Sequence, residues 1–220
     1  MQTRGLGAVS LFLAGMRVCC LAADPSPAGA SDGWTLRSES GGVALYSRPR
    51  VGSAVKEFKA VGEIGAPSRA VHGVIDDFES FANFMPYVVE CRLVKRESDS
   101  ILTYQRLSPK IVSDRDYTLR VHEKSWPGLS GLVYHTRWVA ANEFGPAEKK
   151  GVLRVKLCEG SWLLEPGHDN KTRATYSIYT DSGGAIPAFL ANKASEVGIR
   201  QIFKAVRAQV KNPKYGAAEI

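Results

Sequence analysis

"IPAFLANKASEVGIRQIFKAVRAQVK", residues 186–211, is the stretch that decides the fold of this 220-residue chain. Pro187 suits the first turn of a helix, and apolar residues then recur at steps of three and four. The pattern predicts one amphipathic helix of about 24 residues, roughly 36 Å long. The side of this helix that faces the core or a ligand is expected to carry Ile186, Phe189, Leu190, Ala194, Val197 and Phe203.

Upstream of this helix, most of the sequence has the pattern of strands. Apolar and polar residues alternate over short segments, and polar or Gly/Pro-containing turns join these segments. The predicted strands are 34–39, 43–48, 56–64, 88–96, 101–107, 117–124, 132–139, 151–158, 161–165 and 172–180. Their spacing is typical of an antiparallel meander.

One helix interrupts the strands early in the chain. Pro67 suits its first turn, and the apolar residues from 70 to 78 recur at helical spacing. In "FANFMPYVVECRLVKRE", residues 81–97, Pro86 ends the helical pattern and a strand follows at once. A bulky apolar corner is therefore expected where this helix meets the sheet.

The order of these elements predicts an α+β domain over residues 34–212, with a flexible tail at 213–220. A single curved antiparallel sheet cannot cover its own concave face. The long C-terminal helix is the one element large enough to do so. The sequence has no internal repeat and gives no sign of a second domain.

The N-terminal segment has the layout of a secretory signal peptide over residues 1–23. Arg4 precedes an apolar run, which is shorter than the roughly 20 residues that span a bilayer, and small residues follow. Because Arg17 interrupts the run, a disordered extension remains the alternative, and Cys19 and Cys20 leave a lipoprotein anchor open. A Pro/Gly/Ser-rich linker follows at 24–33. The expected localisation is export, to the periplasm or outside the cell.

The chain is basic, with a formal net charge of +7. Such a balance favours phosphate-bearing surfaces, either nucleic acid or anionic lipid. The aromatic residues do not interleave with the basic ones as a platform for stacked bases would, so no nucleic-acid partner is expected. The basic residues of the C-terminal helix fit either a solvated face or a transient contact with an anionic membrane.

Four blocks, in this order and spacing, resemble the START-domain branch of the helix-grip superfamily in a bacterial version, over about residues 34–210. They are "IGAPSRAVHGVIDDFESFANFMPYV", "SDRDYTLRV", "EGSWLLEP" and "TRATYSIYTDSGGAIPAFLANKA". The resemblance implies a helix-grip fold, in which a curved antiparallel sheet wraps around a long C-terminal helix and encloses a hydrophobic tunnel. It also implies non-catalytic binding of one lipid, sterol or other hydrophobic molecule, commonly with transfer between membranes.

Strand alternation and the bulky apolar corner at residues 81–97 give candidate residues for the lining of that tunnel. They are Phe84, Met85, Gln105, Arg115, Tyr117, Leu119, Tyr134 and Val155. Arg115 has two interpretations. In the first, its guanidinium donates hydrogen bonds to the oxygens of a ligand; in the second, it belongs to an ion-paired corner with Asp114 and Asp116. The inward face of each strand stays open, because one bulge reverses the alternation.

The sequence contains no catalytic motif. It has no nucleophile elbow and no glycine-rich phosphate loop, and its histidines are not spaced as metal ligands. We expect no cofactor, no metal and no catalysis. Because the superfamily includes cyclases and hydrolases, an enzyme acting on a hydrophobic substrate remains the alternative. It would need His, Asp, Arg or Tyr groups to converge inside the tunnel, and it fails if His122, His135 and Arg115 all lie on the outer surface.

Outside the leader the chain has two cysteines, Cys91 and Cys158. Two are too few for a disulfide framework, although one bridge is conceivable in an oxidising compartment. We expect Cys91 to be buried rather than bridged to Cys158. The protein is expected to be a monomer.

Overall fold

The computed structural model describes residues 33–110, 112–181, 183–184 and 186–216. The predicted signal peptide and all but the last residue of the predicted linker lie outside the described residues. The strands are β1 (Thr35–Ser40), β2 (Val43–Arg50), β3 (Ser53–Ile64), β4 (Val88–Arg96), β5 (Ile101–Leu107), β6 (Asp114–Gly128), β7 (Gly131–Ala140), β8 (Val152–Arg154), β9 (Leu157–Pro166) and β10 (Thr172–Asp181). The α-helices are α1 (Ser68–Asp76), α2 (Phe81–Phe84), α3 (Ala188–Gln209) and α4 (Pro213–Gly216), and the 3-10 turns are η1 (Phe78–Ser80) and η2 (Asn142–Phe144).

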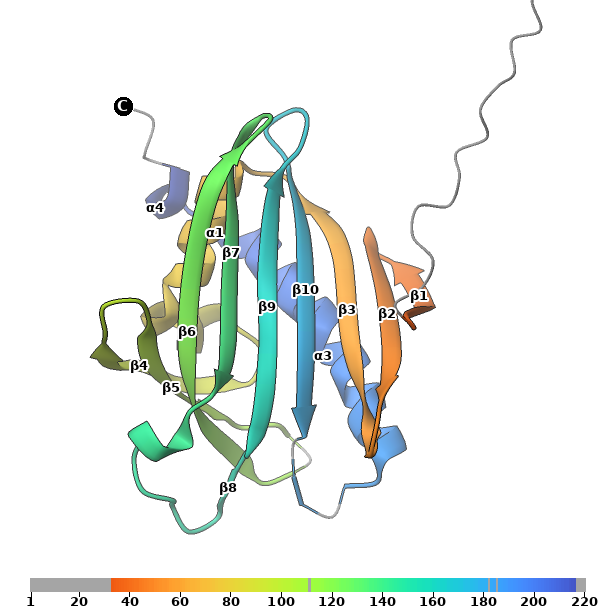
Figure 1. Ribbon diagram of the computed structural model, residues 1–220, viewed down its shortest axis with the longest axis vertical. Coiled ribbons are helices and arrows are strands. Elements are labelled where there is room, and N and C mark those ends of the chain that lie inside the picture. The colour runs from red at the N-terminus through yellow and green to blue at the C-terminus, as the bar shows by residue number, and fades with distance from the viewer. Residues whose placement is uncertain (1–32, 111, 182, 185, 217–220) are drawn as a thin grey trace, which may run out of the picture. The chain divides into compact units, whose positions relative to one another are not determined.

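The strands form one sheet in the order β1-β2-β3-β10-β9-β7-β6-β5-β4, with β8 beside β6. Every pair on the main path is antiparallel, as the spacing of the segments predicts, and only β8 runs parallel to its partner. Figure 1 shows the long central strands side by side, with α3 passing behind them. The predicted α+β class with a curved antiparallel sheet is confirmed.

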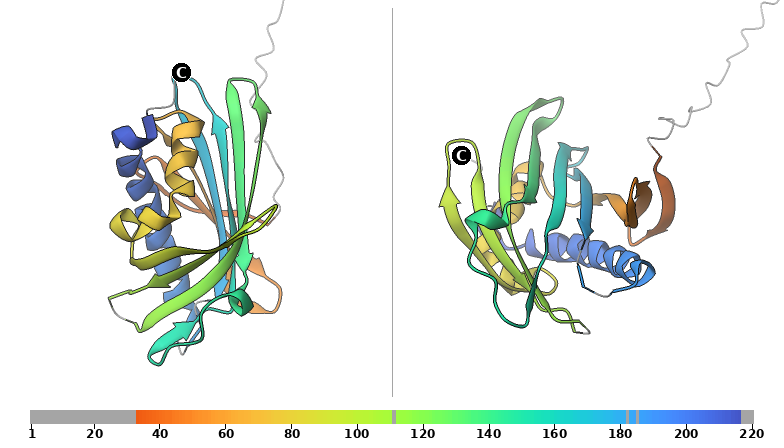
Figure 2. Two further views of the ribbon diagram at one scale, coloured as in Figure 1. Left: turned by 90° about the vertical axis from the view of Figure 1, so that its left-hand side faces the viewer. Right: turned by 60° about the horizontal axis from the view of Figure 1, so that its bottom comes forward.

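Helix α3 lies across the concave face of the sheet (Figure 2). Its apolar side chains Ile199, Phe203 and Val206 are fully buried. The Phe203 ring lies 5.3 Å from that of Trp162, on β9. The helix begins directly after Pro187, as the sequence predicts. Burial of this stripe against the sheet confirms the helix-grip arrangement.

Two arginines attach α3 to the first hairpin. Arg207 donates to the carbonyl oxygens of Gly41 (2.6 Å) and Gly42 (2.9 Å), in the turn between β1 and β2. Arg200 donates to the Ser40 carbonyl oxygen at 2.8 Å. Since both glycines have positive φ, the turn exposes carbonyls that the guanidinium groups satisfy.

The bulky corner at 81–97 has the form that Pro86 predicts. Helix α2 ends at Phe84, Met85 is extended, and β4 begins at Val88. Tyr87 has a φ of 65°, in the left-handed region that bulky residues rarely adopt. Its carbonyl accepts a hydrogen bond from the Ser108 amide at 2.8 Å, which links the corner to the end of β5.

The first half of the predicted tail at 213–220 forms a short helix that contacts α1. Residues Pro213–Gly216 form α4, and the Tyr215 hydroxyl donates to Asp77 Oδ2 at 2.7 Å. Lys214 Nζ contacts the same carboxylate oxygen at 2.6 Å. The sequence pattern could not indicate this, because the partner lies at the end of α1, far away in the chain.

The predicted strand at 151–158 is divided in the structure. Between β8 and β9, the Val155 amide donates to the carbonyl of Asp116 at 2.9 Å. The Val155 carbonyl accepts from Asn142 Nδ2 at 2.8 Å. These bonds replace ladder pairing at Val155, so the alternation of inward and outward side chains changes phase there. Within the described part of the chain, no helix combines the length and the apolar character needed to cross a bilayer.

Candidate functional site

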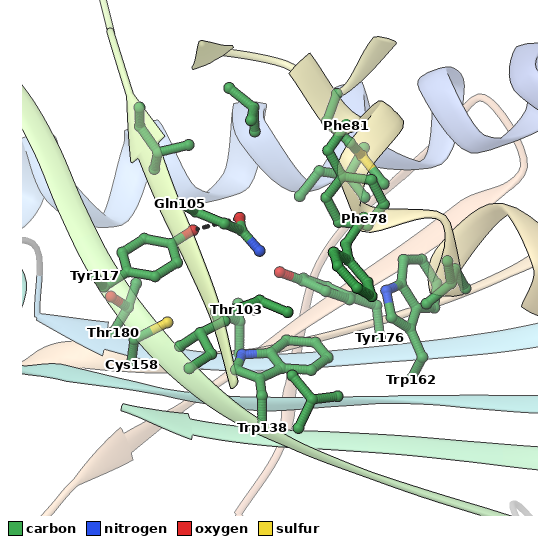
Figure 3. Close-up of a pocket in the computed structure, with 18 of the residues that line it drawn as sticks. Phe78, Phe81, Thr103, Gln105, Tyr117, Trp138, Cys158, Trp162, Tyr176 and Thr180 are labelled. Carbon is green, nitrogen blue, oxygen red and sulfur yellow. Dashed lines mark hydrogen bonds between the residues drawn. The ribbon is translucent and has the colours of Figure 1, made fainter. Parts of the chain in front are cut away.

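A cavity of about 300 Å³ lies between α3, the concave face of the sheet and the corner after α1 (Figure 3). Most of its wall is apolar or aromatic. The wall includes Ile75, Phe78, Phe81, Met85, Ile101, Leu107, Leu119, Val121, Trp138, Val155, Trp162, Tyr176, Ile178, Ile199 and Ile202. Three exposed wall residues, Asp76, Tyr87 and Glu123, mark where the cavity reaches the surface. A partly open, largely apolar space of this size can hold a small hydrophobic molecule.

Strands β5 and β6 form one wall of the cavity through their antiparallel register. Gln105 lies opposite Tyr117, and Leu107 lies opposite Arg115. Every second residue of each strand faces inward, so the side chains of these pairs all reach the cavity. The alternation predicted for Tyr117, Leu119 and Val121 matches the observed wall.

Arg115 is a buried charge on this wall. Its relative exposure is 5%, and burial lowers the pKa of the guanidinium. The group donates to the Ser113 carbonyl, and none of the described carboxylates forms an ion pair with it. A buried cation is stable only when it is compensated, so this guanidinium favours an anionic or strongly accepting group in the cavity.

The neighbouring residue Asp116 points to the other side of the sheet. Arg154 binds it through two nitrogens, at 2.7 Å and 3.1 Å. The Tyr104 hydroxyl donates to it at 3.0 Å, and burial together with this contact raises the pKa of Tyr104 to about 12. Asp114 pairs with Arg106 at 2.7 Å. The "SDRDYTLRV" block therefore contains an ion-paired corner, in which Arg106 and Arg154 and not Arg115 neutralise the two aspartates; contact of Arg115 with a ligand stays a prediction.

Aromatic residues from neighbouring strands form the floor. The ring centroids of Trp162 and Tyr176 are 4.7 Å apart, and those of Trp138 and Tyr176 are 5.8 Å apart. Gly160 makes this packing possible, because a Cβ there would lie 2.5 Å from the indole of Trp138. Alternation in "CEGSWLLEP" could have identified this face, on which Cys158, Gly160 and Trp162 follow one another. The sequence analysis did not assign Trp162 to the cavity.

The structure brings most of the predicted residues together on the cavity wall. They are Met85, Gln105, Arg115, Tyr117, Leu119 and Val155. Contact of these side chains with a ligand stays a prediction.

Two predicted residues lie elsewhere. Phe84 packs against the core cluster instead of the cavity, because the chain turns at Met85. Tyr134 lies beyond the end of the cavity, where α1 covers the sheet, and its ring stacks on His72 at 4.3 Å.

The prediction for the face of α3 is confirmed for Phe203, which is buried in the core, and is wrong for three other residues. Phe189, Leu190 and Val197 are 69%, 50% and 43% exposed, and the residues of α3 that line the cavity are Ser195, Gly198, Ile199 and Ile202. The helix has apolar residues on a wide arc, so periodicity alone could not fix its rotation. Docking onto β3 and β9 selects the side that includes Ile199 and Phe203.

The histidines required by the enzymatic alternative do not converge. His122 lies outside, where Nδ1 is 3.1 Å from the Asp99 carbonyl oxygen, and His135 packs edge-on against Trp126. Of the described residues that line the cavity, none is a histidine. The described residues also contain no group of three His, Cys, Asp or Glu side chains that could hold a metal ion.

Cys91 and Cys158 are free and buried, as expected for Cys91. Burial raises the pKa of both thiols to about 12. Both are therefore protonated at neutral pH and behave as small apolar groups.

Comparison with known proteins gives a consistent result. Residues 64–207 match the family described as polyketide cyclase / dehydrase and lipid transport. An uncharacterised protein of Pseudomonas aeruginosa is 29% identical over 164 residues, covering 74% of this chain and 79% of that protein. The mouse phosphatidylcholine transfer protein is 27% identical over 176 residues, covering 78% and 80%. The crystal structure of a STAR-related lipid transfer protein fragment from Xanthomonas axonopodis has a TM-score of 0.72 at 27% identity, covering 82% and 100%.

Proposed function

The chain belongs to the polyketide cyclase / dehydrase and lipid transport family, and we propose that it binds a lipid or similar hydrophobic molecule non-covalently in its internal cavity. The single observation that carries this proposal is the largely apolar cavity between α3 and the sheet. Removing apolar surface from water stabilises a bound ligand by about 25 cal/mol per Å². A few hundred Å² of buried ligand surface is therefore enough for useful affinity.

Transfer of this ligand between membranes is part of the proposal. Two relatives, the mouse protein and the Xanthomonas protein, are named lipid transfer proteins. The cavity reaches the surface beside Tyr87 and Asp76, so a ligand can enter there if the corner or the neighbouring loop moves. The exposed lysines of α3, Lys193 and Lys204, would assist a transient contact with anionic headgroups.

The geometry favours binding over catalysis. His122 and His135 lie outside the cavity, and Arg115 remains the one member of the suggested catalytic group on its wall. A guanidinium does not exchange a proton near neutral pH, so it suits binding and orientation rather than acid–base chemistry.

Export to the periplasm or outside the cell also belongs to the proposal. It rests on the sequence of residues 1–23, with a basic residue, an apolar run and small residues in that order. Cell fractionation of the full chain, with N-terminal sequencing of the mature protein, tests it. Retention of residues 1–23 in a cytoplasmic protein would contradict export.

The binding proposal is tested by mass spectrometry of the purified protein, native and after delipidation. We expect a stoichiometric hydrophobic ligand to co-purify and to disappear after delipidation. The delipidated protein should then extract a fluorescent lipid from donor vesicles and deliver it to acceptor vesicles. A protein that carries no ligand and that moves none between vesicles would overturn the proposal.

A further inference from the structure

Three uncharged polar residues of the largely apolar cavity wall are Thr103, Gln105 and Tyr176. Their relative exposures are 1%, 9% and 8%. They come from two strands, β5 and β10, that are distant in the order of the sheet. Figure 3 shows the Gln105 amide and the Tyr176 hydroxyl directed toward the same part of the cavity. A buried polar group without a partner is costly, so such a group needs an explanation.

The hydrogen-bond inventory of this cluster is incomplete. The Tyr117 hydroxyl donates to Gln105 Oε1 at 3.2 Å, which uses one of the two lone pairs of that oxygen. Among the described residues, Thr103 Oγ1 is a buried atom without a hydrogen-bond partner. The Gln105 amide nitrogen and the Tyr176 hydroxyl point into the open space of the cavity and make no hydrogen bond with a described residue.

The missing partner has a definite chemistry. An amide nitrogen can only donate, and the two hydroxyls each have a hydrogen to give. The two hydroxyls can also accept, but the Gln105 amide nitrogen cannot, so the complement of the cluster includes an acceptor oxygen. Since no carboxylate or cation belongs to the cluster, a neutral oxygen such as a carbonyl fits better than a charged group.

The position of the charged Arg115 on the same wall gives an expected distance between two groups of the ligand. Arg115 and Tyr117 are two residues apart on β6 and face the same side, which separates them by about 7 Å along the strand. A ligand with an anionic group at Arg115 would thus place a neutral acceptor at Gln105 about 7 Å away.

The size of the cavity limits the rest of the molecule. About 300 Å³ is twice the volume of an apolar cavity of about 150 Å³ that holds one benzene molecule. A single chain or a compact ring system is compatible with this space, whereas two long acyl chains would require the cavity to expand.

We propose that Gln105 and Tyr176 donate hydrogen bonds to a carbonyl oxygen of the ligand, which is a single-chain or compact ester or ketone rather than a plain hydrocarbon. This inference rests on the proposed function, since it specifies the ligand of the same cavity. It assigns the ligand an orientation in the cavity: the carbonyl lies at β5, and the apolar remainder contacts Trp138, Trp162 and Ile199.

The test compares 2-undecanone with undecane as neutral probes, so that Arg115 plays no part. Both displace the fluorescent apolar dye N-phenyl-1-naphthylamine from the delipidated protein, and the ratio of their affinities is measured. Replacing Tyr176→Phe or Gln105→Leu should lower the preference for the ketone by about three- to tenfold, the value of one neutral hydrogen bond. The control is Tyr179→Phe, on the same strand but facing outward toward Arg50, which should leave the ratio unchanged.

The outcomes separate the inference from the proposed function. If neither the dye nor the probes bind the wild-type protein, the proposed function fails and this inference fails with it. If both probes bind and the ratio is the same in all four proteins, only the inference is overturned. Should Gln105→Leu not fold because Tyr117 loses its acceptor, Tyr176→Phe carries the test alone, since it removes one oxygen atom and no hydrogen-bond partner.

Discussion

Arg115 and Asp116 are neighbours in sequence, and both are buried, yet they face opposite sides of β6 with opposite results. Asp116 has Arg154 and Tyr104 as partners on the outer face. Arg115 faces the cavity, and among the described residues it donates to the Ser113 carbonyl and forms no ion pair. On β6, therefore, the carboxylate on the outer face is neutralised within the fold, whereas the guanidinium on the inner face is not neutralised by a described residue.

The outer face should determine stability. Removing one member of a buried ion pair leaves the other uncompensated and costs about 3–5 kcal/mol. We therefore expect Asp116→Ala to lower the free energy of unfolding by about this amount, measured by urea denaturation. The matched control is Asp114→Ala, whose half-exposed pair with Arg106 should be worth about 1 kcal/mol or less. Equal losses in the two variants would contradict the distinction.

Stability and ligand binding should both be sensitive to side-chain volume at the aromatic floor of the cavity. In Gly160→Ala, the new Cβ would lie 2.4 Å from the Ser177 carbonyl oxygen and 2.5 Å from Trp138. Overpacking of this kind costs about 1–3 kcal/mol, and it should also displace the indole and weaken dye binding. Gly198→Ala on α3 is the control, since nothing lies within 4 Å of its Cβ position. That change should stabilise the helix by about 0.5–1 kcal/mol.

Replacing Arg115 should affect binding and not stability. Arg115→Met removes a buried charge that the described residues do not neutralise, so the free energy of unfolding of the empty protein should stay the same or rise. Affinity for dodecyl phosphate should fall about 10- to 100-fold, while affinity for dodecanol changes little. Titration by intrinsic tryptophan fluorescence measures both. Arg120→Met, on the outer face and paired with Glu97, is the control. A loss of stability without a loss of phosphate binding would assign Arg115 to the fold.

The smallest effect is expected where α4 meets α1, away from both faces. Although partial burial opposes it, the hydrogen bonds from Lys214 and Tyr215 lower the pKa of Asp77. A carboxyl with a lowered pKa stabilises the folded state above its unfolded pKa of about 3.9, and this contribution disappears as the pH falls through the folded value. Asp77→Asn should therefore cost about 1 kcal/mol or less at pH 6, and less still at pH 3. Urea denaturation at the two pH values checks the sign of this pH dependence, and an equal loss of stability at both would contradict the prediction.

Much of the fold could be predicted from local patterns. Strand alternation predicted most strands close to their observed positions. Pro67, Pro86 and Pro187 marked where helical patterns begin or end, and the periodicity of the last segment predicted the long terminal helix. The same alternation placed Tyr117, Leu119 and Gln105 on the cavity wall. These predictions succeeded because side chains alternate between the two faces of a strand that has no bulge. Once the face of one residue is known, the faces of its neighbours follow.

The failures have physical causes that the local sequence does not contain. Val155 leaves the ladder to bond with Asp116 and Asn142, which changes the phase between β8 and β9. Tyr134 has the correct face but lies beneath α1, where His72 stacks on it. In each case a segment distant in sequence supplies the partner.

By itself, the sequence determined the class of the fold, the order of its elements and the family, because periodicity and proline positions act over a few residues. Only the tertiary structure decided which side of α3 faces the cavity and which polar groups remain without partners. The apolar arc of α3 is wide enough for several rotations, and its packing against Trp162 and Leu45 selects one. Hydrogen bonds are likewise completed across strands distant in the chain, so the unpaired donors of Gln105 and Tyr176 become visible only when the sheet has closed around the helix.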